Sequence, residues 1–360
     1  MIDKELKLRG VPDILRGTDG ERITDKKTWE ENREKLKELL CLHEYGFLPP
    51  VPKDLKFEIL RSDERFFANT AIYQKILITA SLENGEFSFP VQFVRPKKEG
   101  RHKTIVFLNF RDGVPDKYYP AEEICDRGFA VATIYYKDVT GDDGDFTNGL
   151  AGVLFGGKER NEHDPGKIMM WAWAAMRAAD YLQTLDSADL ESLAVIGHSR
   201  LGKTALVAAA FDERFRFVHS NNSGCSGAAI IRGKTGEQID DICRNFPFWF
   251  CENYKTYRKN ESALPFDQHL LLALSAPRFV SVGSAAEDLW ADPASEFLAC
   301  AAASPVYSLY GKEGLIAPDT FPPEEGAYQV GSIGYYLRPG SHFLSRYDWN
   351  KFLDFIESKV

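Results

Sequence analysis

The stretch Leu193–Lys203, which reads LAVIGHSRLGK, decides the fold that we expect for this chain. It begins with the unbroken apolar run LAVIG, which is typical of a strand buried on both faces of a sheet. The turn 197–200 (GHSR) follows, and the Ala-rich run at 205–210 predicts a helix. This order of strand, turn and helix is that of a nucleophile elbow, which lifts the hydroxyl of Ser199 above the sheet edge. A serine that only caps the helix would give the same local pattern, so that alternative stays open at this point.

Similar apolar runs recur along the rest of the chain and indicate further buried strands at 104–109, 129–135 and 278–285. Helical patterns separate them and also close the chain, at 120–127, 166–185, 205–210 and 348–358. Strands that alternate with helices imply a mostly parallel sheet with helices on both faces. Together with the elbow, this predicts an α/β-hydrolase core over residues 100–360.

Residues 1–99 predict an N-terminal elaboration of this core. The segment 29–43 places leucines on one helical face, and Thr28 with Glu31 matches a capping box. Asn84–Gly85 lies between two alternating apolar segments, which predicts a β-hairpin. We find no repeat and no linker after residue 100, so we expect one domain over residues 1–360.

The composition excludes several classes of protein. The 360 residues carry a net charge of −9 without a basic stripe, which argues against a nucleic-acid-binding protein. The longest apolar runs fall short of the roughly 20 residues that span a bilayer, so we expect no membrane segment. Six scattered cysteines without a C-x-x-C pair favour free thiols, and the charged start MIDKELKLRG does not resemble a secretory signal. These features predict a cytoplasmic location, and they leave the oligomeric state undetermined.

Two later segments favour a nucleophilic role for Ser199. An elbow serine needs a histidine base that is oriented by a carboxylate, in the chain order serine, acid, histidine. His342 lies in a glycine-containing loop just before the C-terminal helix, and Asp288 follows the strand at 278–285. Glu287 is the alternative acid. The three elements therefore occur in the expected order.

The segment GHSRLGK at 197–203 resembles the G-C/H-S-R-x-G-K signature of the glucuronoyl esterases, which cleave esters of (4-O-methyl-)glucuronic acid. In a standard elbow the second glycine stands two residues after the serine, whereas here Leu201 takes that place and Gly202 follows, as in the family signature. Further similar segments are SNNSGCSGAA at 220–229, FPFWFCENY at 246–254 and SAAEDLWADP at 284–293. The resemblance extends over most of the chain.

The resemblance implies specific roles for site residues. Ser199 would be the nucleophile, His342 the general base, and Arg200 a donor to the oxyanion. The family holds the uronate sugar with a lysine, a glutamine and a tryptophan, and the matching positions are Lys203, Gln238 and Trp290. Core packing is the alternative role for Trp290. No cofactor or metal is expected.

This sequence departs from the family pattern at two places. Many members place the acid of the triad as glutamate in a Q-E-S-G segment, where this chain has Asn222, so Asp288 is the expected acid. A sugar-contacting glutamate of some members is replaced near Phe246. We set aside the acidic loop at 142–145 as solvated, because it lacks the spacing of a calcium loop.

Three functions follow as hypotheses. The first is a serine esterase that acts on glucuronic acid esters, with a carbohydrate ester as its substrate. The second is an acetyl xylan esterase that acts on acetylated xylo-oligosaccharides, which the change near Phe246 keeps open. The third is a weakly active relative that binds oligosaccharide, which Asn222 motivates.

Overall fold

The computed structural model describes all residues from Met1 to Val360. One ten-stranded sheet runs through the molecule in the order β1-β2-β3-β5-β4-β6-β7-β8-β10-β9. The pairs within β5-β4-β6-β7-β8-β10 are parallel, whereas β1, β2, β3 and β9 pair antiparallel. The strands are β1 (Asp54–Arg65), β2 (Ala71–Leu82), β3 (Gly85–Pro96), β4 (His102–Asn109), β5 (Phe129–Tyr135), β6 (Ala188–His198), β7 (Phe217–Asn221), β8 (Phe279–Ala285), β9 (Ala327–Tyr328) and β10 (Ile333–Arg338).

Helices precede, separate and follow these strands. The α-helices are α1 (Ile2–Leu8), α2 (Lys26–Leu40), α3 (Phe66–Asn69), α4 (Ala121–Asp126), α5 (Tyr136–Val139), α6 (Gly149–Phe155), α7 (Lys167–Leu182), α8 (Arg200–Phe211), α9 (Ile239–Asn245), α10 (His269–Ala273), α11 (Pro293–Ser308) and α12 (Arg346–Glu357). A π-helical turn, η1 (Cys41–Tyr45), and two 3₁₀ turns, η2 (Glu252–Tyr257) and η3 (Glu261–Ala263), complete the set. None of the helices combines the length and the apolar character needed to cross a bilayer.

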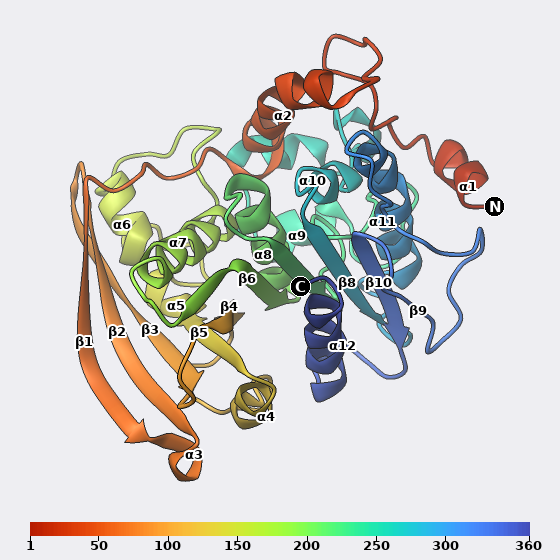
Figure 1. The fold of residues 1–360 in the computed structure, drawn as a ribbon. Coiled ribbons are helices and arrows are strands. Elements are labelled where there is room, and N and C mark those ends of the chain that lie inside the picture. Colours follow the sequence, from red (N-terminus) through yellow and green to blue (C-terminus); the bar gives the residue numbers. More distant parts are fainter.

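The helices form a layer on each face of the sheet, as an α/β-hydrolase requires (Figure 1). Aromatic and aliphatic side chains of α4 and α12 pack on one face, against apolar residues of β4, β5, β6 and β7. Helices α7, α8, α10 and α11 contribute to the larger cluster on the other face. The expected fold class, a mostly parallel sheet with helices on both faces, is confirmed.

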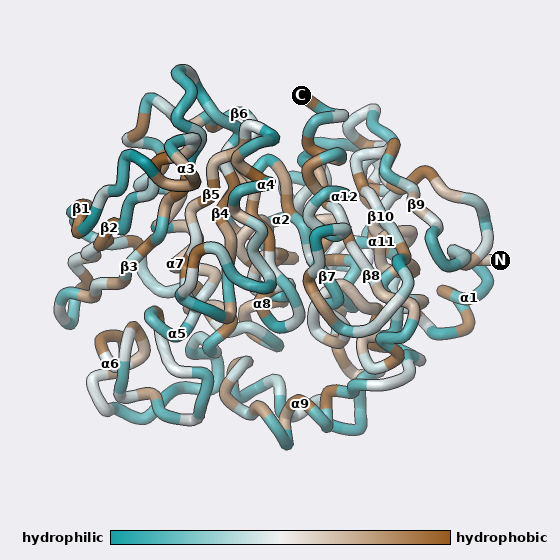
Figure 2. Tube along the Cα trace, turned by 90° about the horizontal axis from the view of Figure 1, so that it is seen from below, coloured by the Kyte–Doolittle hydropathy of each residue, from teal (hydrophilic) through white to brown (hydrophobic).

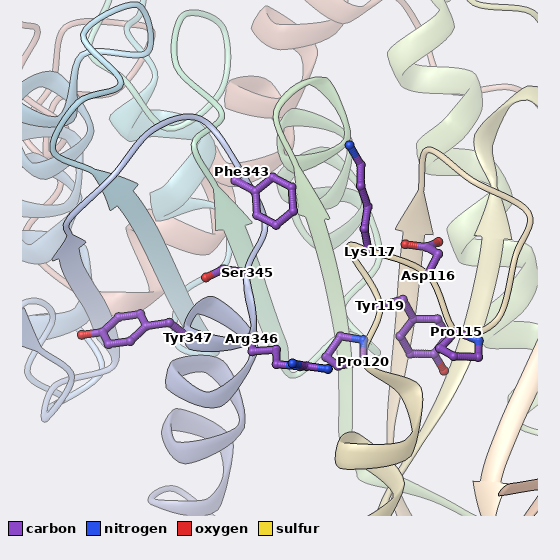
Figure 3. A pocket seen from close by; sticks show the side chains of 9 residues that line it. All are labelled: Pro115, Asp116, Lys117, Tyr119, Pro120, Phe343, Ser345, Arg346 and Tyr347. Carbon is purple, nitrogen blue, oxygen red and sulfur yellow. The ribbon is translucent and has the colours of Figure 1, made fainter.

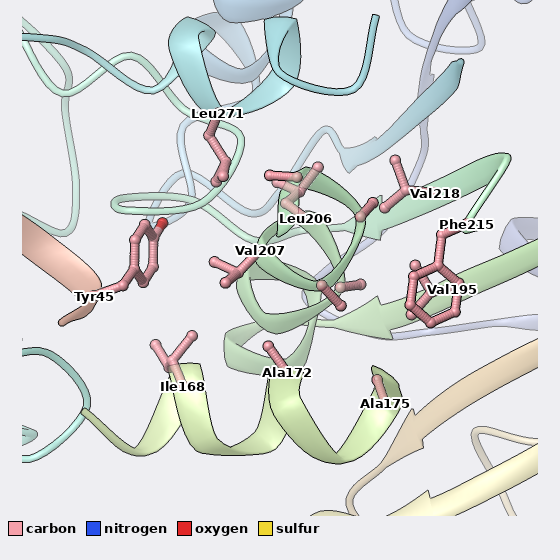
Figure 4. Packing of buried hydrophobic residues seen from close by; sticks show 14 of the residues in the cluster. Tyr45, Ile168, Ala172, Ala175, Val195, Leu206, Val207, Phe215, Val218 and Leu271 are labelled. Carbon is pink, nitrogen blue, oxygen red and sulfur yellow. The ribbon is translucent and has the colours of Figure 1, made fainter. Parts of the chain in front are cut away.

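The contact between α7 and α8 shows how the larger layer is packed. Ile168 and Ala172 of α7 point toward Val207 of α8, and all three are buried (Figure 4). The small alanines let α7 and α8 approach closely. Because α8 begins directly after Ser199, this packing also holds the turn that carries Ser199. The hydropathy trace places hydrophobic residues in the central strands and hydrophilic ones in many of the outer loops (Figure 2).

The N-terminal elaboration contains the predicted hairpin, since β2 and β3 pair from Leu82 opposite Gly85. The first helix differs from its prediction at both ends. Its N-cap is Asp25, whose carboxylate accepts a hydrogen bond from the Thr28 N–H at 3.0 Å, so the predicted Thr28–Glu31 capping box is wrong. The α-helix ends at Leu40, and its last predicted turn is the π-helical η1.

Parallel strands bring their carboxyl ends to one edge of the sheet, and that edge carries the candidate site. β6 leads to Ser199, β7 to Asn222, β8 to Asp288 and β10 to His342. Strands β4 and β5 end at the same edge, from which the segments at 110–120 and 136–148 extend.

Candidate active site

Ser199 stands at a strained turn between β6 and α8. Its φ of 57° and ψ of −128° lie outside the regions that most side chains adopt. Gly197 is required by the same turn, because a Cβ there would lie 1.9 Å from the backbone oxygen of Leu201. The backbone N–H of Ser199 donates to Asn221 O at 2.9 Å, which ties the turn to the neighbouring strand β7. These features are those of a nucleophile elbow rather than of an ordinary helix cap.

His342 and Asp288 meet across the edge of the sheet. His342 Nδ1 lies 2.6 Å from Asp288 Oδ2, and the Asp288 side chain is buried. Glu287 is exposed and contacts the His342 loop only through its backbone N–H, which donates to Gly340 O at 3.0 Å. The geometry therefore selects Asp288 rather than Glu287 as the carboxylate partner of His342.

Ser199 and His342 line one open cavity of about 530 Å³. Its walls come from the strand ends of β4, β6 and β10 and from the segment after β4. The lining residues are Phe110, Arg111, Tyr118, His198, Ser199, Arg200 and His342.

The Asp288 carboxylate is held in its ionised form. Burial raises its pKa, but the hydrogen bond and the charge of His342 and the hydrogen bond from Asn222 outweigh burial, so the net pKa lies below the usual value. Asn222 Nδ2 donates to Asp288 Oδ2 at 2.8 Å. An ionised carboxylate on Nδ1 fixes the imidazole and leaves its Nε2 free to accept a proton.

His198, the residue before Ser199, is a second imidazole beside His342. The two ring centroids are 4.5 Å apart, and His198 Nδ1 lies 2.7 Å from Asn221 Oδ1. Burial, and then the proximity of His342, lower the pKa of His198 to about 3. His198 is therefore neutral at physiological pH and places no positive charge against His342.

Arg200 is locked in place beside Ser199. Its guanidinium forms an ion pair with Asp142 and lies over the ring of Trp249, with 4.5 Å between Arg200 Cζ and the ring centroid. Asp142 also accepts hydrogen bonds from Tyr136 Oη at 2.9 Å and from Trp249 Nε1 at 2.8 Å. Phe246 stacks on Trp249 with the ring centroids 3.9 Å apart. A cation with this many neighbours stays in one position when charge develops next to it.

The three predicted sugar-binding residues lie in one connected region. Lys203, one turn after Ser199 on α8, is buried, donates to Ser223 O at 2.6 Å and lies 3.6 Å from the Glu237 carboxylate. The Glu237 backbone N–H donates to Trp290 O at 3.0 Å, so Trp290 and Gln238 lie near this ion pair.

Trp290 and Gln238 differ in how free their side chains are. The Trp290 side chain is 54 % exposed, which excludes the alternative role in core packing. Gln238 precedes α9, and its side-chain amide donates to the backbone oxygens of Lys234 at 3.0 Å and Gly236 at 3.2 Å. Both amide donors of Gln238 therefore already have partners in the loop, and its side chain also forms a capping box with Asp241 at the start of α9.

A second cavity, of about 620 Å³, lies next to the His342 loop (Figure 3). Phe343 and Lys117 project into it from loops on facing sides, with Arg346 and Pro120 below them. The ring of Phe343 packs on Tyr118 with the centroids 4.9 Å apart. Because Phe343 lines this cavity and Tyr118 lines the first, the aromatic pair lies between the two.

Two interactions of this site were not predicted from the sequence, that of Asp142 with Arg200 and that of Asn222 with Asp288. Asp142 was assigned to a solvated loop, but its side chain is only 7 % exposed and it holds Arg200, so that assignment is wrong for this residue. The partner of Asn222 was also not predicted. A buried Trp and a Tyr that both donate to Asp142 are long-range contacts, which leave no local pattern in the sequence. No group of three or more His, Cys, Asp or Glu side chains is arranged to hold a metal ion.

The geometry fits one chemical task. A hydroxyl on a strained turn, an imidazole paired with an ionised carboxylate, and a fixed cation beside the hydroxyl together suit nucleophilic attack on a carbonyl. The free backbone N–H groups at the start of α8 and the Arg200 guanidinium are donors for the oxyanion that such attack produces.

Comparisons with known proteins agree on one family. The sequence profile described as "Glucuronyl esterase, fungi" matches residues 78–311. The chain is 33 % identical to carbohydrate esterase MZ0003 from an unknown prokaryotic organism, over 96 % of this chain and 89 % of that protein. It is 29 % identical to 4-O-methyl-glucuronoyl methylesterase of Podospora anserina, over 89 % of this chain and 63 % of that protein. Among solved structures, a glucuronoyl esterase from Solibacter usitatus is similar with a TM-score of 0.90 and 32 % identity, over 97 % of each chain.

Proposed function

Because the chain belongs to the glucuronoyl esterase family and is thus a carboxylic ester hydrolase, we propose that it cleaves the ester of a (4-O-methyl-)glucuronic acid residue through an acyl-enzyme. The observation that carries the mechanism is the 2.6 Å contact of His342 with the buried Asp288, in the cavity that Ser199 lines. This arrangement supplies a base for the serine without any further group.

In the first half of the reaction, His342 Nε2 accepts the proton of the Ser199 hydroxyl while Oγ attacks the ester carbonyl. The Asp288 carboxylate stabilises the imidazolium that forms. Arg200 and the backbone N–H groups at the start of α8 stabilise the oxyanion of the tetrahedral intermediate. His342 then donates its proton to the departing alcohol oxygen, which leaves the glucuronoyl group on Ser199.

In the second half, water takes the place of the alcohol beside His342. His342 removes a proton from this water, which attacks the acyl carbon. As the tetrahedral intermediate collapses, the bond to Ser199 Oγ breaks and His342 returns the proton to Oγ, which releases the uronic acid and restores the free serine. Because the alcohol and the water both exchange protons with His342, both occupy the cavity between His342 and the rings of Phe110 and Tyr118.

We assign the sugar ring to the region of Lys203, Gln238 and Trp290, which do not line the cavity of Ser199 and His342. Trp290 offers an exposed ring face, against which the apolar face of a pyranose can stack. We assign Lys203 and Gln238 as polar partners for the ring hydroxyls, in line with the family resemblance. The esterified carboxyl is uncharged, so Lys203, which already pairs with Glu237, contributes hydrogen bonding rather than neutralisation.

The test compares the wild type with Ser199→Ala on two substrates, benzyl glucuronate and an acetylated xylo-oligosaccharide. We expect the wild type to release benzyl alcohol and Ser199→Ala to lose kcat by about 10⁵-fold, because no other group can carry the acyl intermediate. Release of acetate alone would contradict the uronate assignment and keep the serine mechanism. Equal rates for the two proteins would contradict the role of Ser199, and no turnover by either would favour an oligosaccharide-binding protein.

A further inference from the structure

A tight turn after β7 places an amide against the carboxylate that holds His342. We propose, on the basis of the function proposed above, that Asn222 is a positioning residue: its side-chain amide fixes the Asp288 carboxylate so that Oδ2 faces His342. Asn222 would act through Asp288 and would not itself touch the substrate. No such role follows from the sequence pattern, in which position 222 only lacks the acid that some relatives carry there.

The first observation is that two donors converge on one oxygen. Asn222 Nδ2 lies 2.8 Å and His342 Nδ1 lies 2.6 Å from the same atom, Asp288 Oδ2. The other oxygen, Oδ1, accepts from the backbone N–H of Ala291 at 3.3 Å. A carboxylate on a loop can rotate about its own bonds, and donors from two different directions hold it in one rotamer.

The second observation is that the backbone carrying Asn222 is anchored on both sides. The Asn222 N–H donates to Gly283 O on β8 at 2.8 Å. Two residues later, the Gly224 N–H donates to Glu296 Oε1 at 2.9 Å, and Ser284 Oγ donates to Glu296 Oε2 at 2.5 Å. Because Glu296 is fully buried on α11, the turn is fixed to β8 and α11 together. An amide on such a turn is a stable reference point for Asp288.

The third observation concerns the other half of the amide. Asn222 Oδ1 is buried and has no hydrogen-bond partner. A buried acceptor without a partner is unfavourable, so the amide as a whole is a poor structural choice at this position. The hydrogen bond from Asn222 Nδ2 to Asp288 explains why an amide stands at this position despite that cost.

A backbone role is the competing explanation for Asn222. Its φ is 48°, in the left-handed region that asparagine tolerates better than most residues. Glycine adopts a positive φ at least as readily as asparagine but has no side-chain amide. The variant Asn222→Gly therefore separates the two roles, since it keeps the turn and removes the donor.

The amide at position 222 is also neutral, which matters beside a carboxylate. A carboxylate at position 222 would place a second negative charge at hydrogen-bond distance from Asp288, whereas the amide adds a donor and no charge. The other charged or titratable groups close by are His198, packed on His342, Glu296, behind the turn, Lys203, which donates to Ser223 O, and the exposed Glu287 next to Asp288. Extra negative charge beside Asp288 stabilises the imidazolium of His342 relative to the neutral imidazole.

The experiment measures kcat, KM and the pH profile of kcat/KM on benzyl glucuronate for the wild type, Asn222→Gly and Asn222→Asp. The matched control is Asn69→Gly, an asparagine with a φ of 76° at the end of α3, between β1 and β2. We expect Asn222→Gly to lose kcat by about 10- to 100-fold with KM changed less than about threefold, because positioning acts on the transition state. Asn222→Asp should move the acid limb of the profile to higher pH, and Asn69→Gly should behave as the wild type.

A wild-type kcat and pH profile in folded Asn222→Gly, with turnover still dependent on Ser199, would overturn the proposal and leave the proposed function intact. A measurement that needs no substrate tests the proposal even if the proposed function is wrong. In the ¹H NMR spectrum, the Nδ1 proton of His342 should resonate far downfield in the wild type and shift or broaden in Asn222→Gly. An unchanged resonance would overturn the proposal even if benzyl glucuronate were not a substrate.

Discussion

At the scale of single residues, Asp142 determines where the positive charge of Arg200 lies. Asp142→Asn would keep an acceptor for Trp249 or Tyr136 but remove the charge that pairs with Arg200. We expect kcat on benzyl glucuronate to fall by about 10-fold in Asp142→Asn and by about 100-fold in Asp142→Ala, because the oxyanion loses a fixed cation. KM should change little in both variants.

The control for this prediction is the exposed neighbour Asp143, since Asp143→Asn removes the same charge from the same loop without touching Arg200. Wild-type kcat in Asp142→Ala would show that Arg200 does not need its carboxylate partner. A parallel loss in Asp143→Asn would assign the effect to the charge of the loop as a whole.

Some residues of the active site could be predicted from the sequence, and others could not. Ser199, Asp288 and His342 each follow a recognisable strand or loop, so the rule that parallel strands end at one edge was enough to bring them together. The residues that hold Arg200 and Asp288 in place could not be predicted from strand ends. Asp142 is 58 residues from Arg200 and Asn222 is 66 residues from Asp288, and neither contact leaves a spacing in the sequence.

At the scale of elements, helix α8 owes its position to two glycines with different tolerances. A Cβ on Gly202 would meet Ser220 Oγ at 3.0 Å and Ser223 Cβ at 3.1 Å, so α8 would need to shift by a few tenths of an ångström. We expect Gly202→Ala to cost about 1–2 kcal/mol of unfolding free energy and to lower kcat about 10-fold by moving Ser199. Gly197→Ala, whose Cβ would collide with the backbone oxygen of Leu201, should not form the elbow at all.

Thermal unfolding and kcat/KM on benzyl glucuronate test whether Gly202→Ala is mildly impaired and Gly197→Ala severely impaired. Gly144→Ala is the control, because no atom lies within 4 Å of its added Cβ. A Gly202→Ala protein as active as the wild type would show that the displaced glycine of the signature has no packing role.

Elements could be predicted from the sequence where their surroundings are uniform. β4 and β5 are buried along their length, and their apolar runs reveal them. β1 is largely exposed, and β7 carries a buried histidine and serine, so neither shows an apolar run or a regular alternation. The N-terminus of α2 was misplaced by three residues because Asp25 and Thr28 are both good caps, and only the tertiary structure decides between them.

At the scale of the whole molecule, a fully buried carboxyl makes stability depend on pH. Burial raises the pKa of Glu296 to about 7, against hydrogen bonds from Gly224 and Ser284 that lower it. Between pH 4.5, the ordinary value for glutamate, and about 7, the folded chain keeps a proton at Glu296 that the unfolded chain has released. The free energy of unfolding therefore falls as the pH rises through this window.

Glu296→Gln removes this titration while keeping an oxygen for the Gly224 N–H and a polar group for Ser284. Relative to the wild type, the variant should gain on the order of 1–3 kcal/mol of unfolding free energy between pH 5 and pH 8, since one pKa unit corresponds to about 1.4 kcal/mol. Urea unfolding at both pH values measures the difference. Glu159→Gln, at an exposed position that meets water in both states, should show no such change. A constant difference between Glu296→Gln and the wild type at the two pH values would mean that Glu296 is ionised in the folded protein throughout, stabilised there by the same turn that carries Asn222.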